Sequence, residues 1–240
     1  MVKIAVSGAC GKMGKRIISL AGKDPGLELI FGLENINHQD INKTVNGIEI
    51  SADLGRLETC DCLIDFSMPG AILEYLPYLL KFRKCAVIGT TGFDENEQLK
   101  IKRASQVIPV VFSPNMSVGV NLLFRLIKDA AKILKEYTVN IEESHHIHKK
   151  DSPSGTAKKI AQIVNEQGFN LKIEEIKAVR EDEIVGEHRV LFESGLDKIE
   201  LFHSAKTRDI FVQGALRAAK WVVNKNPRLY SMDDVLFNKP

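Results

Sequence analysis

The densest set of chemically active side chains lies in one short stretch, residues 143–157. Three of the six histidines fall within it, and Lys149 and Lys150 follow the last of them directly. Histidine exchanges a proton near neutral pH, and a lysine ammonium is a compact positive charge. The combination predicts a site that binds an anion and carries its own proton donors.

Two other interpretations of this stretch are open. Clustered imidazoles are good metal ligands, but the adjacent lysines would repel a divalent cation, and no cysteine lies nearby. We therefore expect no metal. A solvated polar loop is the other interpretation, although a loop between a strand and a helix often carries function.

A helix is expected to follow this stretch, from Thr156 to about Gln167. Gly155 and Thr156 come after Pro153 and would open it with backbone N–H groups that have no helical acceptor. Those groups and the positive end of the helix dipole attract anions. The favoured ligand is a small carboxylate with one or two acidic groups. Hydride delivery to its unsaturated carbon would need a compensating proton, which an imidazolium or an ammonium can supply.

A second candidate site lies near the start of the chain, where the strand-like run Val2–Val6 leads into the glycine turn Gly8–Gly14. Glycines at such a turn let backbone N–H groups approach a pyrophosphate. The spacing is G-x-x-G-x-x-G rather than G-x-G-x-x-G, and a turn without a ligand is the alternative. Glu34 ends the next strand-like run, where an acidic side chain accepts hydrogen bonds from ribose hydroxyls. An ordinary solvent-facing carboxylate is the alternative there.

The cofactor predicted by this turn is a nicotinamide dinucleotide, NADH or NADPH. Asn35 is neutral and Glu34 would repel a 2′-phosphate, so NADH is favoured, although Lys12 could offset that repulsion. Two more loops, Gly89–Gly92 and Ser113–Met116, end later strands and would face the same crevice. Ordinary turn chemistry accounts for each of them separately.

The elements of the first half must position these loops. Short apolar strands alternate with helices, which predicts an α/β fold with a Rossmann-like, doubly wound parallel sheet covered on both faces. The expected strands are Val2–Val6, Leu27–Leu33, Cys62–Phe66, Cys85–Gly89 and Pro109–Phe112, and the expected helices are Lys12–Ala21, Ala71–Phe82 and Glu95–Ala104.

The second half has a different pattern, which predicts a C-terminal α+β domain with a mixed or antiparallel sheet. A helix-period stripe of Val120, Leu123, Ile127, Ala131 and Leu134 marks a helix over Val118–Lys135. One strand comes before the helix expected from Thr156, three strands without long helices between them come after it, and the chain ends in another helix. These elements are Thr138–Ser144, Ile173–Val179, Glu187–Glu193 and Lys198–Ser204, then the helix Phe211–Asn224.

The composition is that of an ordinary globular protein, with 44% hydrophobic residues, 27% charged residues and a formal net charge of +2. No basic stripe marks a nucleic-acid surface, and no apolar stretch is long enough to span a bilayer. We expect neither nucleic acid nor membrane as a partner. Without a signal-peptide pattern, the cytoplasm is the expected location. The four cysteines lack paired spacing and are expected to be small buried thiols.

Residues 143–157 resemble 4-hydroxy-tetrahydrodipicolinate reductase (dihydrodipicolinate reductase), a family of the diaminopimelate route to lysine. Its signature E-x-H-H-x-x-K-x-D-x-P-S-G-T-A is matched from Glu143 to Ala157 without a gap. The resemblance covers essentially the whole chain. It extends to the cofactor loops at 8–14, 89–92 and 114–121 and to the carboxyl end at 229–236.

The resemblance implies a role for each candidate residue. His145 would be the principal acid/base residue and Lys149 the second proton donor, while His146, Gly155 and Thr156 would bind the carboxylates of a small dicarboxylate substrate. The dinucleotide would be held by Gly8, Ala9, Cys10, Gly11, Lys12, Met13, Glu34, Gly89, Thr90, Thr91, Ser113, Pro114, Asn115 and Met116.

The resemblance also implies an organisation. Residues 1–117 and 208–240 would form the dinucleotide-binding domain, and residues 118–207 the domain for substrate binding and oligomerisation. Arg208 and Phe211 would lie near the interdomain hinge. A homotetramer through the sheet of the second domain is implied as well.

The implied reaction is reduction of dehydrated 4-hydroxy-tetrahydrodipicolinate to tetrahydrodipicolinate. Met116 stands where many members carry phenylalanine, and Asn35 where some carry arginine, so the cofactor preference stays open. A reductase of another unsaturated dicarboxylate and a non-catalytic dinucleotide-sensing module are the alternatives. A semialdehyde dehydrogenase would need a nucleophilic cysteine beside the histidines, and all four cysteines lie in the first half.

Overall fold

The structure is a computed structural model that describes residues 1–237. The chain divides into two compact units. Unit 1 comprises Met1–Met116 and Phe211–Pro240, and unit 2 comprises Ser117–Ile210. The boundaries expected from the sequence fall at residues 117 and 208.

Unit 1 is built on an eight-stranded sheet with the order β12-β7-β6-β5-β1-β2-β4-β3. Neighbouring strands are parallel except for the β3–β4 pair, which is antiparallel. This confirms the predicted parallel sheet. The strands are β1 (Val2–Ser7), β2 (Leu27–Leu33), β3 (Thr44–Val45), β4 (Ile48–Ser51), β5 (Cys62–Asp65), β6 (Cys85–Ile88), β7 (Pro109–Phe112) and β12 (Arg228–Tyr230).

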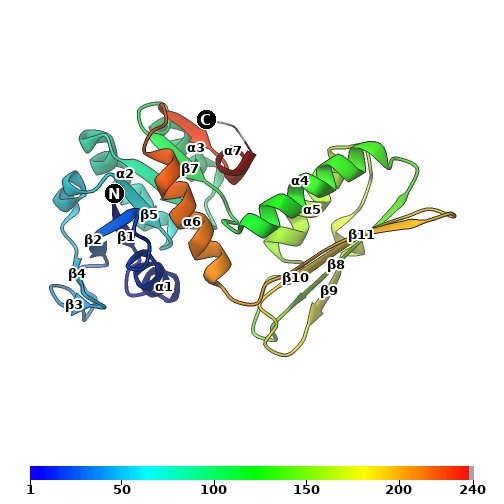
Figure 1. The fold of residues 1–240 in the computed structure, drawn as a ribbon, viewed down its shortest axis with the longest axis horizontal. Helices are drawn as coiled ribbons and strands as arrows, with labels where there is room; N and C mark the ends of the chain where they lie inside the picture. The colour runs from blue at the N-terminus through cyan, green and yellow to red at the C-terminus, as the bar shows by residue number, and fades with distance from the viewer. Residues whose placement is uncertain (238–240) are drawn as a thin grey trace. The chain divides into compact units, whose positions relative to one another are not determined.

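Helices cover both faces of this sheet (Figure 1). Because successive side chains of a strand point to opposite faces, Ile4 and Val6 of β1 join one apolar cluster and Ala5 joins the other. A strand covered on both sides must be apolar throughout, which explains the continuous apolar runs. The first cluster includes α1 (Lys12–Ala21), α6 (Asp209–Val222) and α7 (Met232–Phe237), and the second includes the 3-10 helix η1 (Leu54–Thr59), α2 (Pro69–Phe82) and α3 (Glu95–Ala104).

Unit 2 is a four-stranded sheet with the order β11-β10-β8-β9 and two helices on it (Figure 1). Strand β10 is antiparallel to both β8 and β11, whereas β8 and β9 are parallel, so the sheet is mixed as predicted. Four members of the predicted helical stripe are buried, and Leu134 is the partly buried cap residue. The elements are α4 (Val118–Ile133), β8 (Thr138–His145), α5 (Gly155–Asn165), the 3-10 helix η2 (Ile173–Glu175), β9 (Lys177–Arg180), β10 (Glu187–Glu193) and β11 (Lys198–Ser204).

Some expected elements need correction. The strand predicted over Ile173–Val179 begins only at Lys177, because Lys172 and Glu175 exchange hydrogen bonds that close a 3-10 turn first. Strands β3, β4 and β12 and helix α7 are short elements that the sequence pattern did not indicate. Cys10 is partly exposed, so the expectation of buried thiols holds for the other three cysteines alone.

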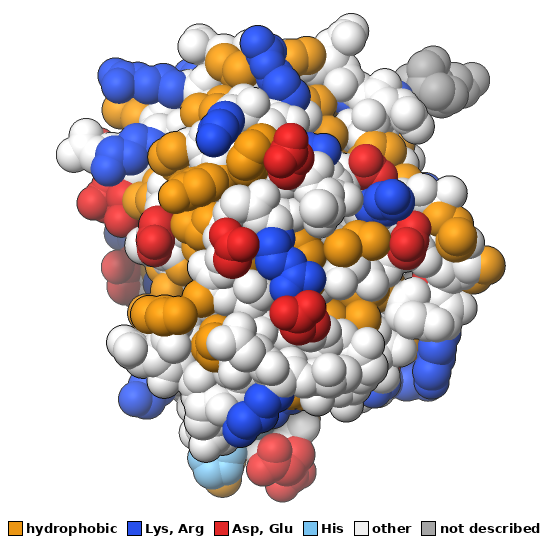
Figure 2. Space-filling view, turned by 90° about the vertical axis from the view of Figure 1, so that its left-hand side faces the viewer, with side chains coloured by type: hydrophobic (Ala, Val, Ile, Leu, Met, Phe, Trp, Pro, Cys, Tyr) orange, Lys and Arg blue, Asp and Glu red, His pale blue; other side chains and the backbone are white. Residues whose placement is uncertain are grey.

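The charge distribution on the surface and the length of the helices bear on whether nucleic acid or a membrane could be a partner. The face shown in Figure 2 carries Lys and Arg side chains interspersed with Asp and Glu, so neither charge sign dominates it. Over residues 1–237, the structure contains no helix that combines the length and the apolar character needed to cross a membrane.

Candidate active site

The glycine turn is shaped by close backbone contacts that exclude side chains. Gly8 has a φ of +66°, and a Cβ atom on it would stand 2.9 Å from the carbonyl oxygen of Phe66. A Cβ atom on Gly14 would stand 2.1 Å from the carbonyl oxygen of Gly8. Both positions therefore require glycine, and the first turn of α1 packs directly onto the loop after β1.

The start of α1 is left open to a ligand. Its N-cap residue is Gly11, no side chain of the described residues caps it, and its first turn contains no acidic residue. Helix α3, by contrast, begins with a capping box in which Asp94 and Glu97 satisfy the first amides. Uncapped amides at the positive end of a helix suit a phosphate.

Glu34 lies against this turn. Its Oε2 accepts a hydrogen bond from the Cys10 backbone N–H at 3.0 Å, and its Oε1 accepts one from the Asn35 N–H at 3.0 Å. Burial, together with the Glu34 and Asp40 carboxylates, raises the pKa of the Cys10 thiol. The end of β2 is thereby joined to the turn after β1.

The loop after β6 contains a buried hydrogen-bond network that the sequence analysis missed. Thr90 donates to Asp65 Oδ2 at 2.6 Å and accepts from the Ser67 backbone N–H at 2.9 Å, and Ser67 Oγ donates to Asp65 Oδ1 at 2.5 Å. Burial raises the pKa of Asp65 despite these hydrogen bonds. The signal in the sequence was an acidic residue that ends an apolar strand.

The remaining predicted cofactor residues lie in the same set of loops in unit 1. Gly89 packs against the Phe66 ring, because a Cβ atom there would stand 2.3 Å from that ring. Ser113 Oγ donates to the Asn115 carbonyl oxygen at 2.8 Å, and this loop continues to the buried Met116. All of these loops follow the carboxyl ends of parallel strands, where open sheets of this kind bind ligands.

A cleft of about 590 Å³ opens in unit 1 near the amino ends of strands β1 and β6. None of the sequence-predicted site residues lines it. Its lining includes Val2, Asp61, Arg83, Lys84, Cys85 and Lys220.

In unit 2, His145 is held by a buried carboxylate. Its Nδ1 contacts Glu143 Oε2, and Glu143 also accepts from Arg180 Nη2 at 2.8 Å and from the Ser154 backbone N–H at 3.2 Å. Burial alone would raise the pKa of Glu143, but His145 and Arg180 outweigh it and lower that pKa to about 2. Arg180 reaches this position because it pairs with His145 across the parallel strands β8 and β9.

A second buried histidine, His188 on β10, adjoins this group. Its ring centroid lies 5.3 Å from that of His145, with the rings nearly perpendicular, and its Nε2 lies 3.3 Å from Ser154 Oγ. Burial and then the neighbouring His145 lower the pKa of His188 to about 3, so it is neutral at physiological pH. Sequence reasoning missed His188 and Arg180, because both come from strands far along the chain.

The predicted anion site holds a carboxylate of the protein itself. Lys149 Nζ lies 2.8 Å from Asp151 Oδ1, and the Gly155 backbone N–H at the start of α5 also interacts with this carboxylate. Burial opposes ionisation of Asp151, but Lys149 outweighs it, and the pKa of Asp151 is lowered. A lysine and a helix N-terminus therefore already converge on one carboxylate.

His146 lies beside another cation. Its Nε2 stands 3.5 Å from Arg208 Nη2, and its Nδ1 is buried without a hydrogen-bond partner among the described residues. Desolvation and then Arg208 lower the pKa of His146, which favours the neutral ring. The structure thus groups His145, His146, Lys149 and Gly155 in unit 2, and the predicted cofactor residues in unit 1.

Sequence comparisons identify two matching family models. One described as "Dihydrodipicolinate reductase, N-terminus" matches residues 2–116, and one described as "Dihydrodipicolinate reductase, C-terminus" matches residues 119–236. The chain is 39% identical to the 4-hydroxy-tetrahydrodipicolinate reductase of Syntrophobacter fumaroxidans and 42% identical to that of Geobacter sulfurreducens. Each alignment covers 98% of this chain and 99% of the relative.

Structural comparison indicates the same fold. The dihydrodipicolinate reductase of Paenisporosarcina sp. TG-14, solved with dipicolinate bound, has a TM-score of 0.83 at 23% identity, with 96% of this chain and 97% of that chain covered. The amine dehydrogenase of Mycobacterium smegmatis has a TM-score of 0.63 at 10% identity, with 97% and 95% covered. Because the sequence identities to these two solved structures are low, the structural similarity shows that the fold is shared and nothing more.

Proposed function

The chain belongs to the dihydrodipicolinate reductase family, and we propose that it reduces 4-hydroxy-tetrahydrodipicolinate, through dihydrodipicolinate, to tetrahydrodipicolinate in the diaminopimelate route to lysine. The enzyme is an NAD(P)H-dependent oxidoreductase. The observation that carries the proposed site is the Asp151 carboxylate, which lies between Lys149 and the first amide of α5 beside the motif of His145.

Substrate binding is proposed for the same segment. A substrate carboxylate would displace Asp151 from Lys149 and from the Gly155 amide, and would bind there and at the Thr156 amide, at the positive end of α5. His146, with Arg208 next to it, would bind the second carboxylate. The Paenisporosarcina relative is described with dipicolinate, itself a dicarboxylate, which supports this ligand class.

Proton transfer is assigned to His145, with Lys149 as the second donor. Glu143 and Arg180 would keep the His145 ring oriented, because the Glu143 carboxylate accepts from both. A reduced nicotinamide supplies the hydride when it is bound. The chain's own contribution is then to hold the carboxylates and to deliver one proton next to the carbon that is reduced.

The dinucleotide is assigned to the loops at the carboxyl ends of the unit 1 strands. The uncapped amides of α1 and the turn that excludes side chains at Gly8 and Gly14 fit a pyrophosphate. Glu34, next to that turn, would accept from the adenosine ribose hydroxyls. NADH is favoured because this carboxylate would repel a 2′-phosphate and Asn35 brings no positive charge to offset it.

The test of the reaction uses freshly made product of the preceding synthase as substrate. Oxidation of NADH or NADPH is followed by loss of absorbance of the reduced nicotinamide. We expect turnover with both nucleotides and a lower KM for NADH. If neither nucleotide were oxidised, the proposed reaction would be wrong.

Asn35→Arg should shift the cofactor preference towards NADPH. If the ratio of kcat/KM for NADH and NADPH did not change, the loop at Asn35 would not be the part of the chain that contacts the 2′-position of the adenosine ribose.

Unit roles and assembly are part of the proposal. Unit 1 would bind the dinucleotide, and unit 2 would bind the substrate and form a homotetramer through its sheet. The edge strand β11 supports this, because Phe202 on it is 49% exposed and lies on the opposite face from Leu201, which packs against the core of unit 2. Light scattering should give the mass of four chains, and Phe202→Glu should lower it.

We also propose a cytoplasmic location, because the four cysteines form no disulfide and thiols stay reduced in that compartment.

A further inference from the structure

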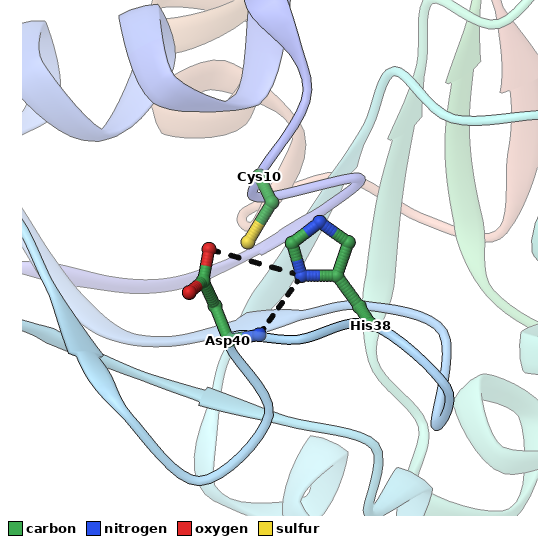
Figure 3. A group of neighbouring side chains, drawn as sticks. All are labelled: Cys10, His38 and Asp40. Carbon is green, nitrogen blue, oxygen red and sulfur yellow. Dashed lines mark hydrogen bonds and ion pairs between the residues drawn. The ribbon is translucent and has the colours of Figure 1, made fainter.

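Unit 1 contains a second group of chemically active side chains, none of which belongs to residues 143–157. It consists of Cys10, His38 and Asp40 (Figure 3). One potential ligand atom of each residue, the Sγ, an imidazole nitrogen and a carboxylate oxygen, lies within 4.8 Å of the other two. Cys10 belongs to the turn after β1, whereas His38 and Asp40 belong to the loop after β2. All three are partly exposed, so an ion from solvent can reach them.

We propose that these three side chains form a site for a divalent metal ion of the zinc type. Zn²⁺ binds thiolate, imidazole and carboxylate ligands, and with three protein ligands it keeps a fourth position for water. At metal–ligand distances of about 2.0–2.3 Å, tetrahedral ligand atoms stand about 3.5 Å apart. The group, now within 4.8 Å, therefore has to contract by up to about 1.3 Å. Rotation of partly exposed side chains can supply that movement.

The charges around the group match a dication. The Asp40 carboxylate supplies one negative charge, and Cys10 supplies a second when the metal displaces its thiol proton to solvent. Glu34 adds a carboxylate close by, because its Oε2 accepts from the Cys10 N–H at 3.0 Å. Two lysines oppose the cation. The Lys43 Nζ lies 3.6 Å from Asp40 Oδ1 with its side chain 62% exposed, and the exposed Lys15 acts electrostatically on the Cys10 thiol, so both side chains can turn into solvent.

The loop after β2 already presents both of its ligands to Cys10. The His38 backbone N–H donates to the Asn35 carbonyl oxygen at 2.8 Å, and the Asp40 N–H donates to His38 Nδ1 at 3.2 Å. Metal binding through Nδ1 would release that second hydrogen bond. The Cys10 thiol makes no hydrogen bond to any residue in the described part of the chain, so its sulfur is available to a metal.

A metal ion here would lie against the glycine turn. Cys10 is one of the residues proposed to hold the dinucleotide, and its amide is joined to Glu34. Bound metal should therefore compete with the adenosine end of the dinucleotide. This consequence rests on the proposed function, whereas the metal site itself does not.

Direct binding tests the site without any substrate. The full chain, freed of metal and kept reduced with a phosphine, is titrated with Co²⁺ in the absence of dinucleotide. We expect one equivalent to give a thiolate-to-cobalt charge-transfer band and the ligand-field bands of a four-coordinate ion. Zn²⁺ should then abolish both by displacement. Absence of the charge-transfer band at saturating Co²⁺ would overturn the proposal.

Variants assign the band to its ligands. Cys10→Ser should remove the charge-transfer band, and His38→Gln and Asp40→Asn should each weaken Co²⁺ binding by about 100-fold or more. Changing a residue that only hydrogen-bonds to a metal ligand already costs about 10- to 100-fold in metal affinity. Circular dichroism verifies folding of each variant. His188→Gln is the matched control, because Glu143, His145 and His188 form the other group of metal-binding type. If His188→Gln abolished binding and His38→Gln did not, the proposed site would be wrong.

Competition is measured separately. Zn²⁺ should raise the apparent KM for the dinucleotide in wild-type protein and should do so far less in His38→Gln. Cobalt binding without any such competition would leave the metal site standing and would instead contradict the placement of the dinucleotide at Cys10. If wild-type protein turned over its substrate normally but gave no charge-transfer band with Co²⁺, the metal site would be overturned and the proposed function would stand.

Discussion

The glycine turn of unit 1 and the histidine–lysine segment of unit 2 are both suited to anions, but they are built differently. The turn at Gly8–Gly14 presents backbone amides and depends on the absence of side chains, since a Cβ atom on Gly14 would stand 2.1 Å from a carbonyl oxygen. The segment at 143–157 presents charged side chains. Its Glu143 and Asp151 carboxylates each bind a cationic or imidazole partner.

This difference in construction predicts that the two sites respond to different kinds of substitution. A site made of backbone should respond little to changes in nearby charge and more to one added carbon atom. A site made of partnered charges tolerates changes in shape but is sensitive to the loss of one partner, most of all where the other is left buried, as Glu143 would be. Substitutions at the two sites should therefore separate dinucleotide binding from proton transfer.

The largest expected effect is that of His145→Ala. Loss of a positioned general acid or base typically lowers turnover by about 100- to 10,000-fold, and kcat should fall by this amount. Dinucleotide affinity, measured by nicotinamide fluorescence, should stay within about twofold, since no residue of the glycine turn changes. His148→Ala is the matched control, because its side chain is 72% exposed and lies three positions along the same motif. Equal losses in both variants would show that His145 has no special role.

Glu143→Gln comes next and tests the buried partner. The pKa of Glu143 is lowered from 4.5 to about 2 in the folded chain. The folded state thus binds this proton more weakly than the unfolded state does, so the carboxylate stabilises the fold above about pH 4.5 and this contribution is lost as the pH falls towards 2. The difference corresponds to about 3 kcal/mol. Urea denaturation of Glu143→Gln should show lower stability at neutral pH and a flatter pH dependence.

The control for Glu143→Gln is Glu142→Gln on the same strand. Glu142 pairs with Lys177 at the surface, at 2.9 Å, where the two side chains are 38% and 68% exposed. Its loss should change the free energy of unfolding by less than about 1 kcal/mol. Parallel pH profiles for wild type and Glu143→Gln would contradict the buried-carboxylate interpretation.

Much of the fold could be predicted from the sequence, and the exceptions have a common cause. Helix α3 was predicted with its observed bounds, Glu95–Ala104, because its charges and apolar spacing are local signals. Strands β3 and β12 have two and three residues, too few for an apolar pattern. Strand β12 exists because it pairs with β7, far away in the sequence. Contacts of that kind leave no local signal.

The same limit applies to the site. His145 and Lys149 could be proposed because they share one motif. Arg180 and His188 reach Glu143 and His145 only through the register of three strands, which sequence periodicity does not encode. The Cys10–His38–Asp40 group was missed for the same reason, since two loops bring it together.

Lys149→Ala should have a smaller effect than the changes at Glu143 and His145. Losing a charge-assisted hydrogen bond to a carboxylate costs about 1.5–3 kcal/mol, so kcat/KM should fall by about 10- to 100-fold, with much of the change in KM. Lys150→Ala is the control, because it removes an exposed neighbouring charge. If the two variants were alike, only the overall charge of the segment would matter, and the specific carboxylate contact would be excluded.

Gly14→Ala should have the smallest effect, and it tests the other half of the comparison. The added methyl group meets backbone rather than a flexible side chain, so α1 has to shift, at a cost of about 1–3 kcal/mol. Dinucleotide affinity should fall by about tenfold, while the titration of the histidine–lysine segment, followed by NMR, should not change. Gly70→Ala is the control: Gly70 lies in α2 with no atom within 4 Å of an added Cβ, so alanine there should be neutral or slightly stabilising. Normal dinucleotide affinity in Gly14→Ala would mean that the tight turn serves packing alone, and the backbone site would have to be assigned elsewhere.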